Sequence, residues 1–65
     1  MLKEARKAKK MTQQHLADLI GVTRTQVRNW EIKKNRPSNP KTIAWIAEVL
    51  EIDVKDLILF FYSED

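Results

Sequence analysis

The stretch TQQHLADLIGVTRTQVRNWE, Thr12 to Glu31, contains two short helical patterns separated by the only glycine of the chain. Thr12 suits the N-cap of the first helix, and Gly21 tolerates the left-handed conformation that ends one. Thr23 and Gln26 have the spacing of a capping box, in which hydroxyl and amide each satisfy a backbone donor, so a second helix opens at once. The sequence therefore predicts two helices joined by a three-residue turn.

The second of these helices has two chemically different sides. At about 100° per residue, Val27 and Trp30 point to one side. The opposite side carries only side chains that can hydrogen-bond: Arg24, Thr25, Arg28 and Asn29. Arginine can bond guanine O6 and N7 together, and asparagine can pair with adenine N6 and N7. This side suits the major groove of DNA, although an ordinary solvated face is the alternative for any single amphipathic helix.

Further helices are predicted on either side of this pair. One is expected over 2–9. Another begins at Pro40 after the capping residue Asn39 and runs to Leu50, with apolar residues at helical spacing. The last, capped by Asp53, is expected over 54–59. With no strand pattern before the C-terminal tail and no linker, we predict one all-α domain of five helices over 1–65.

Charge is distributed unevenly along the chain. The overall formal charge is +3, but residues 1–36 carry ten Lys or Arg against three Asp or Glu, whereas 37–65 carry two against six. A basic half favours a polyanionic partner, with nucleic acid first and an anionic membrane surface second. Lysines that only keep a small protein in solution are the alternative.

Composition excludes several classes of protein. Without cysteine, neither a disulfide framework nor a thiolate metal site can form, and the single His15 cannot hold a metal alone. No apolar stretch approaches the roughly 20 residues that span a bilayer. Because there is no signal region, we expect a cytoplasmic protein with no membrane partner. The chain offers no base and nucleophile pair, so we expect no enzyme, no cofactor, no metal and no small-molecule ligand.

The stretch LKEARKAKKMTQQHLADLIGVTRTQVRNWE, from Leu2, and the segment IAEVLEIDVKDLI, ending at Ile58, together resemble the Cro and repressor-type helix-turn-helix family of bacterial and phage regulators, also called the xenobiotic-response-element type. The resemblance covers nearly the whole chain and is most specific over the opening quotation. It implies a compact lambda-repressor-like five-helix bundle whose helix-turn-helix occupies 13–31 and binds double-stranded DNA.

The resemblance also implies roles for individual residues. Arg24, Thr25 and Asn29 match base-reading positions. Arg28 and Gln26 match secondary positions that touch either a base or the backbone, according to how deep the helix sits. Gln13 matches a phosphate contact that also buttresses the recognition helix. Arg6 and Glu31 match a structural ion pair. The remaining backbone contacts are assigned from charge to Lys10, Lys33, Lys34, Asn35 and Arg36, and a solvated basic face is the alternative for Lys10. Lys33 stands where many relatives have glycine.

The C-terminal region is more apolar than so small a core can cover. The residues concerned are Trp45, Leu59, Phe60, Phe61 and Tyr62. The rings can fold back and cap the core. Alternatively, the segment 57–65 forms a homodimer interface, either as a packed helix or as a short strand paired with its symmetry mate. A two-fold dimer would read two half-sites about 34 Å apart.

These features favour a transcriptional regulator, a homodimeric repressor of phage, plasmid, mobile-element or antitoxin type that reads a pseudo-palindromic operator. One alternative keeps the fold but is a protein-interaction module, such as an antitoxin or adaptor, that uses Trp45 and the tail. Another is a basic domain that binds nucleic acid without sequence preference or binds RNA.

Overall fold

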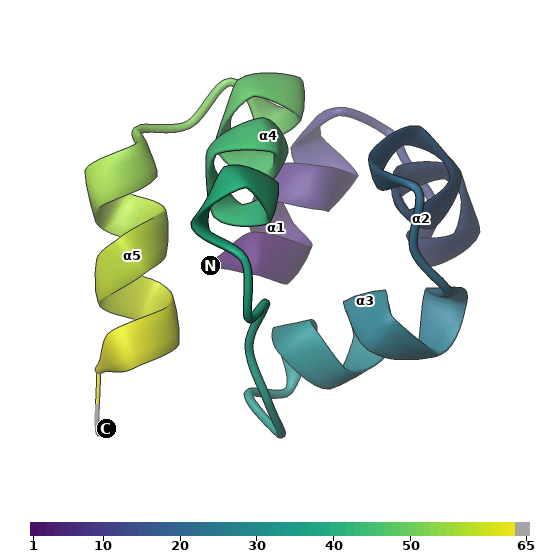
Figure 1. Cartoon of the computed structure of the whole chain (residues 1–65). Helices are drawn as coiled ribbons and strands as arrows, with labels where there is room; N and C mark the ends of the chain where they lie inside the picture. Colours follow the sequence, from purple (N-terminus) through teal and green to yellow (C-terminus); the bar gives the residue numbers. More distant parts are fainter. Residues whose placement is uncertain (64–65) are drawn as a thin grey trace.

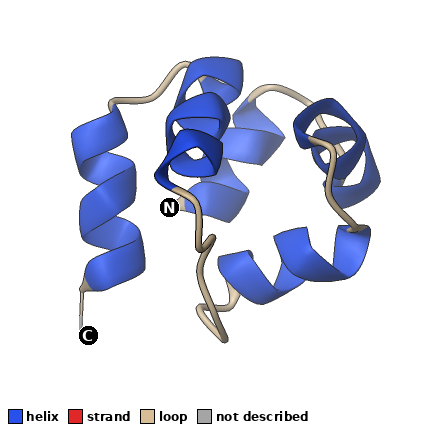
Figure 2. Ribbon diagram, viewed as in Figure 1, coloured by secondary structure: helices blue, strands red, loops and turns tan. Residues whose placement is uncertain are grey.

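The computed structural model describes residues 1–63, and this part of the chain contains five α-helices and no strand (Figures 1 and 2). The helices are α1 (Leu2–Ala8), α2 (Gln13–Ile20), α3 (Arg24–Glu31), α4 (Pro40–Leu50) and α5 (Val54–Tyr62). The predicted all-α five-helix fold is therefore confirmed. Residues 64 and 65 of the segment proposed for dimerisation lie outside the described residues.

Side-chain caps begin the helices at the residues where the sequence predicted them. The Thr12 hydroxyl accepts from the His15 backbone N–H at 3.0 Å. Asn39 and Asp53 accept in the same way from backbone N–H groups two residues later, each at 2.9 Å. These caps satisfy N–H groups that have no partner within their own helix. Local chemistry alone thus defines where α2, α4 and α5 start.

Two helix ends differ from prediction. The helix α1 ends at Ala8 rather than Lys9, because Lys10 takes the left-handed conformation with φ of 58° and turns the chain away. The helix α5 continues three residues beyond Leu59 to Tyr62. The alternative that the tail forms a short terminal strand is therefore wrong for the residues up to Tyr62. The helix continues because Phe61, one turn after Leu57, packs on the same side into the core.

One hydrophobic core holds all five helices. Each helix contributes at least one completely buried side chain, and the largest of these are Leu2, Leu16, Val27, Ile46 and Leu57. Trp30 and Phe61 fill the remaining space and are 4% and 5% exposed. The burial of Phe61 corrects its expected place on an exposed tail, because another chain cannot reach it without opening the core. Of the two alternatives given for the tail, Phe61 follows the one in which the ring folds back onto the core.

The helices lie around this core so that α3 occupies one edge of the molecule. In Figure 1, α4 and α5 stand side by side, α1 lies behind α4, and α3 runs along the lower edge. The ends of α1 and α4 are joined by an ion pair between Lys9 and Glu51, and this hydrogen bond lowers the pKa of the Glu51 carboxyl. None of the helices in residues 1–63 is long and apolar enough to cross a membrane.

Candidate nucleic-acid interface

The turn between α2 and α3 is held by backbone and side-chain hydrogen bonds. Gly21 has φ of 81°, and its N–H and that of Val22 both donate to the Ala17 carbonyl, at 2.8 and 2.9 Å. Two residues later, the Thr23 hydroxyl accepts from the Gln26 N–H at 3.1 Å, while the Gln26 side chain accepts from the Thr23 N–H at 2.9 Å. The predicted capping box is confirmed, and it defines the direction in which α3 leaves the turn.

The outer side of α3 is open to solvent. Val27 and Trp30 are buried on the inner side, as predicted. On the outer side, Arg24, Thr25 and Arg28 are exposed, and Asn29 is half-buried. The residues described, 1–63, thus leave three of these four side chains uncovered and cover the fourth only in part. Base edges of a duplex could therefore reach these four side chains without any rearrangement of the fold.

A buried ion pair ties the end of α3 to the two preceding helices. The Arg6 guanidinium on α1 donates from Nε and Nη2 to the two Glu31 carboxylate oxygens, at 2.6 and 3.3 Å. Its Nη1 also donates to the Met11 carbonyl at 2.6 Å. The Arg6 and Glu31 side chains are only 7% and 3% exposed. Because the pair is bidentate, it holds the orientation of α3 as well as its position.

Gln13 connects the same carboxylate to α2. Its side-chain amide donates to Glu31 Oε1 at 3.0 Å, so the first residue of α2 supports the last residue of α3. Gln13 is half-buried and Glu31 is nearly covered. The side chain thus lies between the core and the surface, where it can both buttress α3 and face a phosphate.

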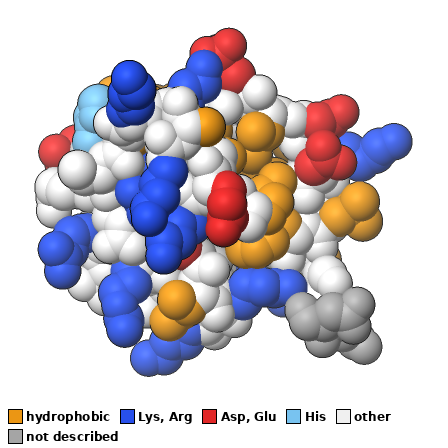
Figure 3. Space-filling model, turned by 180° about the vertical axis from the view of Figure 1, so that it is seen from behind, with side chains coloured by type: hydrophobic (Ala, Val, Ile, Leu, Met, Phe, Trp, Pro, Cys, Tyr) orange, Lys and Arg blue, Asp and Glu red, His pale blue; other side chains and the backbone are white. Residues whose placement is uncertain are grey.

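Basic side chains surround the open side of α3. Figure 3 shows the molecule from behind, with α5 on the right: Lys and Arg lie mostly over the left and lower parts, on the side of α2 and α3, and the largest hydrophobic patch lies toward α5. The loop between α3 and α4 contributes four exposed polar residues, Lys33, Lys34, Asn35 and Arg36. Lys10, after α1, is exposed as well. We name residues 33–36 the basic loop.

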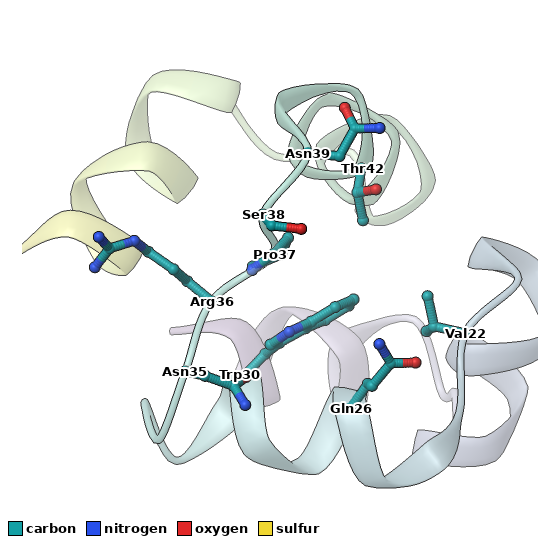
Figure 4. Close-up of a pocket in the computed structure, with 9 residues that line it drawn as sticks. All are labelled: Val22, Gln26, Trp30, Asn35, Arg36, Pro37, Ser38, Asn39 and Thr42. Atoms are coloured by element: carbon teal, nitrogen blue, oxygen red, sulfur yellow. The ribbon is translucent and has the colours of Figure 1, made fainter.

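A pocket of about 190 Å³ lies between α3 and the start of α4. Figure 4 shows the Trp30 ring and the Gln26 amide on one wall, with Asn39 and Thr42 on the other. The Gln26 side chain therefore lines this pocket and also accepts a hydrogen bond from the Thr23 N–H at the start of its own helix. The contact of Gln26 with a base or with the DNA backbone stays a prediction.

The apolar surface that the tail was expected to provide is a continuous stripe on α5. Leu59 and Tyr62 are 63% and 53% exposed, and Trp45 on α4 is 50% exposed. Val54 and Ile58 lie eight and four residues before Tyr62 and are exposed too. Neither was among the individual residues predicted for the dimer interface, although their four-residue spacing predicts one helical face. Phe60 is only half-buried and packs partly against the core.

The chain is similar in sequence to known helix-turn-helix proteins. Residues 2–57 match the protein family described as Helix-turn-helix. The uncharacterized HTH-type transcriptional regulator YqaE of Bacillus subtilis is 37% identical over 57 residues, which cover 88% of this chain and 48% of that protein. The chain thus spans about half the length of this curated relative. No solved structure matches the chain.

Proposed function

The chain belongs to the helix-turn-helix family, and on that premise we propose that it is a sequence-specific regulator of transcription that inserts α3 into the major groove of double-stranded DNA. The observation that carries this proposal is the open outer side of α3, where four hydrogen-bonding side chains stand opposite buried Val27 and Trp30. The relative YqaE, whose name describes it as an HTH-type transcriptional regulator, supports the same function.

Four residues of α3 would read the bases. Arg24 and Arg28 would donate to guanine O6 and N7, and Asn29 would pair with adenine. The Thr25 methyl group would contact thymine. Each well-formed bidentate contact is worth about 1–3 kcal/mol of discrimination against the wrong base.

The residues around α3 would bind the DNA backbone. Lys10 is exposed after α1 and the basic loop directly follows α3, and their charge fits the phosphates of a DNA backbone. Gln13 would add a phosphate contact while it supports Glu31. Gln26 would act through the cap of α3. Such contacts set affinity and register and carry no sequence information of their own.

A homodimer would double the length of DNA that is read. The exposed stripe of α5, with Leu59 and Tyr62, together with Trp45 on α4, supplies apolar surface for a second copy. Phe61 is excluded because it lies in the core, and Phe60 would contribute at the edge. A dimer seated on a pseudo-palindromic operator would exclude other proteins from that DNA, so we include repression in the proposal. The proposal is therefore a homodimeric repressor of phage, plasmid, mobile-element or antitoxin type.

Selection of binding sites from random duplexes tests the proposal. We expect enrichment of a palindrome with half-sites about one helical turn apart. Uniform binding that weakens steeply with salt would instead indicate a domain without sequence preference, and enrichment of RNA over duplex DNA would contradict the proposal.

Two substitutions separate base reading from backbone binding. Arg24→Ala should relax the preference at one base position in each half-site. Lys34→Ala should weaken binding to all sequences alike, and by more than Lys55→Ala, a matched loss of charge on the far helix α5. If Arg24→Ala and Lys34→Ala weakened every sequence equally, the assignment of the base-reading face would be wrong.

A second candidate is a protein-interaction module. The observation that favours it is the same exposed apolar surface, because Trp45 and Leu59 suit a different protein as well as a second copy. Lack of binding to any duplex in the selection, together with a monomer in sedimentation, would favour this candidate over the first.

A further inference from the structure

The basic loop contacts the last turn of α5 through two aromatic rings. The Arg36 guanidinium carbon lies 4.2 Å from the centre of the Tyr62 ring. The Lys33 ammonium lies 5.2 Å from the centre of the Phe60 ring and also donates to the Ser63 carbonyl at 3.3 Å. Figure 4 shows the Arg36 side chain extending away from the pocket toward the C-terminal helix. Both distances lie within the range of cation–π attraction.

The start of the basic loop is defined by an unusual backbone position. Lys33 has φ of 60°, and the Lys34 N–H donates to the Asn29 carbonyl at 2.9 Å. This hydrogen bond, which spans five residues, is one of the two that define a Schellman motif at the end of a helix. This position favours glycine, because a Cβ there crowds the following carbonyl. Lys33 occupies this position, and its ammonium group contacts α5 at Phe60. The loop is thus held at its first residue by Phe60 and at its last by Tyr62.

The Arg36 guanidinium can still bind a phosphate while it lies over the Tyr62 ring. A planar guanidinium attracts a ring through its face, whereas its N–H groups donate in the plane, so one arginine can do both at once. An exposed arginine without such support loses much of its rotamer freedom when it binds. A ring that already holds the side chain reduces this loss, which is the general advantage of preorganisation.

We propose that Tyr62, on α5, is a positioning residue for DNA binding: its ring holds Arg36 in the orientation in which the guanidinium edge meets a backbone phosphate. This inference rests on the proposed function and adds that α5 contributes to DNA affinity without touching DNA. In this role Tyr62 acts through Arg36, so it affects all sequences alike, and Tyr62→Leu keeps an apolar side chain on the surface proposed for the dimer. Phe60 holds Lys33 in the same manner at the other end of the loop.

The test is a double-mutant cycle on Tyr62 and Arg36, measured as affinity for the selected duplex and for an unrelated duplex. Tyr62→Leu should weaken binding to both duplexes about two- to fivefold, the range of an exposed cation–π contact. Tyr62→Phe, which keeps the ring, should bind like the wild type. In the Arg36→Ala background, Tyr62→Leu should have no further effect. Tyr62 is half exposed, so these variants should keep the fold.

The cycle also separates this role from dimerisation. Loss of dimers would weaken binding by the same factor whether or not Arg36 is present, and that result would overturn the proposal. So would tighter binding by Tyr62→Leu, since it would mean that the ring holds Arg36 away from DNA. If the wild type bound no duplex, the proposed function itself would fail. The Arg36 side-chain proton resonances of the DNA-free protein should shift in Tyr62→Leu and not in Tyr62→Phe.

Discussion

Removal of Arg6 should destabilise the domain severely, because it leaves the Glu31 carboxylate buried without its cation. Arg6→Met keeps most of the side-chain volume but removes three hydrogen bonds, two to Glu31 and one to the Met11 carbonyl. Breaking a buried ion pair by deleting one partner costs about 3–5 kcal/mol. A chain of 65 residues has a total stability of roughly 3–10 kcal/mol. The variant should therefore lose at least about a third of its stability at room temperature, and all of it if the domain lies at the lower end of that range.

Two further variants make this prediction specific. Arg6→Met with Glu31→Met removes both charges, and it should lose only about 1–2 kcal/mol, since what is lost is then hydrogen bonding to Gln13 and to the Met11 carbonyl. Lys7→Met removes an exposed charge from the same helix and should change stability by less than about 0.5 kcal/mol.

Urea unfolding, followed by circular dichroism and by the fluorescence of the tryptophans, measures all three variants. The reasoning would be refuted if Arg6→Met cost less than about 1 kcal/mol, or if the double variant were less stable than Arg6→Met. Base preference should be the same in every variant at temperatures where it is folded, because Arg6 and Glu31 support α3 from behind and do not face the groove.

Three other changes test the local structure. Gly21→Ala should cost about 1–2 kcal/mol in thermal unfolding, entirely from φ of 81°, since nothing lies within 4 Å of an added Cβ; no loss would contradict the left-handed turn. Thr23→Ala should cost about 1 kcal/mol by removing the hydroxyl that accepts from the Gln26 N–H, and it should speed hydrogen exchange in the first turn of α3. Lys9→Met should raise the pKa of Glu51, whose carboxyl is held below its ordinary value by the Lys9 hydrogen bond. That contact stabilises the fold at neutral pH and is lost as pH falls through the lowered pKa, and NMR titration of the Glu51 carboxyl measures the change.

The helices were predictable because their signals are local. Thr12, Thr23 and Asp53 act through backbone groups two or three residues away, and the apolar spacing of four residues identifies the inner side of each helix. The end of α5 was less predictable. Leu59 to Tyr62 is apolar at every position, and such a run does not by itself distinguish helix from strand.

Placement of the aromatic rings required the tertiary structure. Phe60, Phe61 and Tyr62 are consecutive, yet one is half-buried, one lies in the core and one is exposed. Helical periodicity distinguishes the buried ring from the exposed one only when it is already known that α5 continues to Tyr62. Contacts between Lys33 or Arg36 and these rings join residues about 26 positions apart, and no spacing rule connects them.

By itself, the sequence determined the five helices, the turn at Gly21 and the polar outer side of α3, because caps, helical period and charge act over a few residues. Only the tertiary structure decided which tail rings enter the core and which cations they hold. Those contacts depend on where α5 packs relative to the loop after α3, and that packing is a property of the whole core.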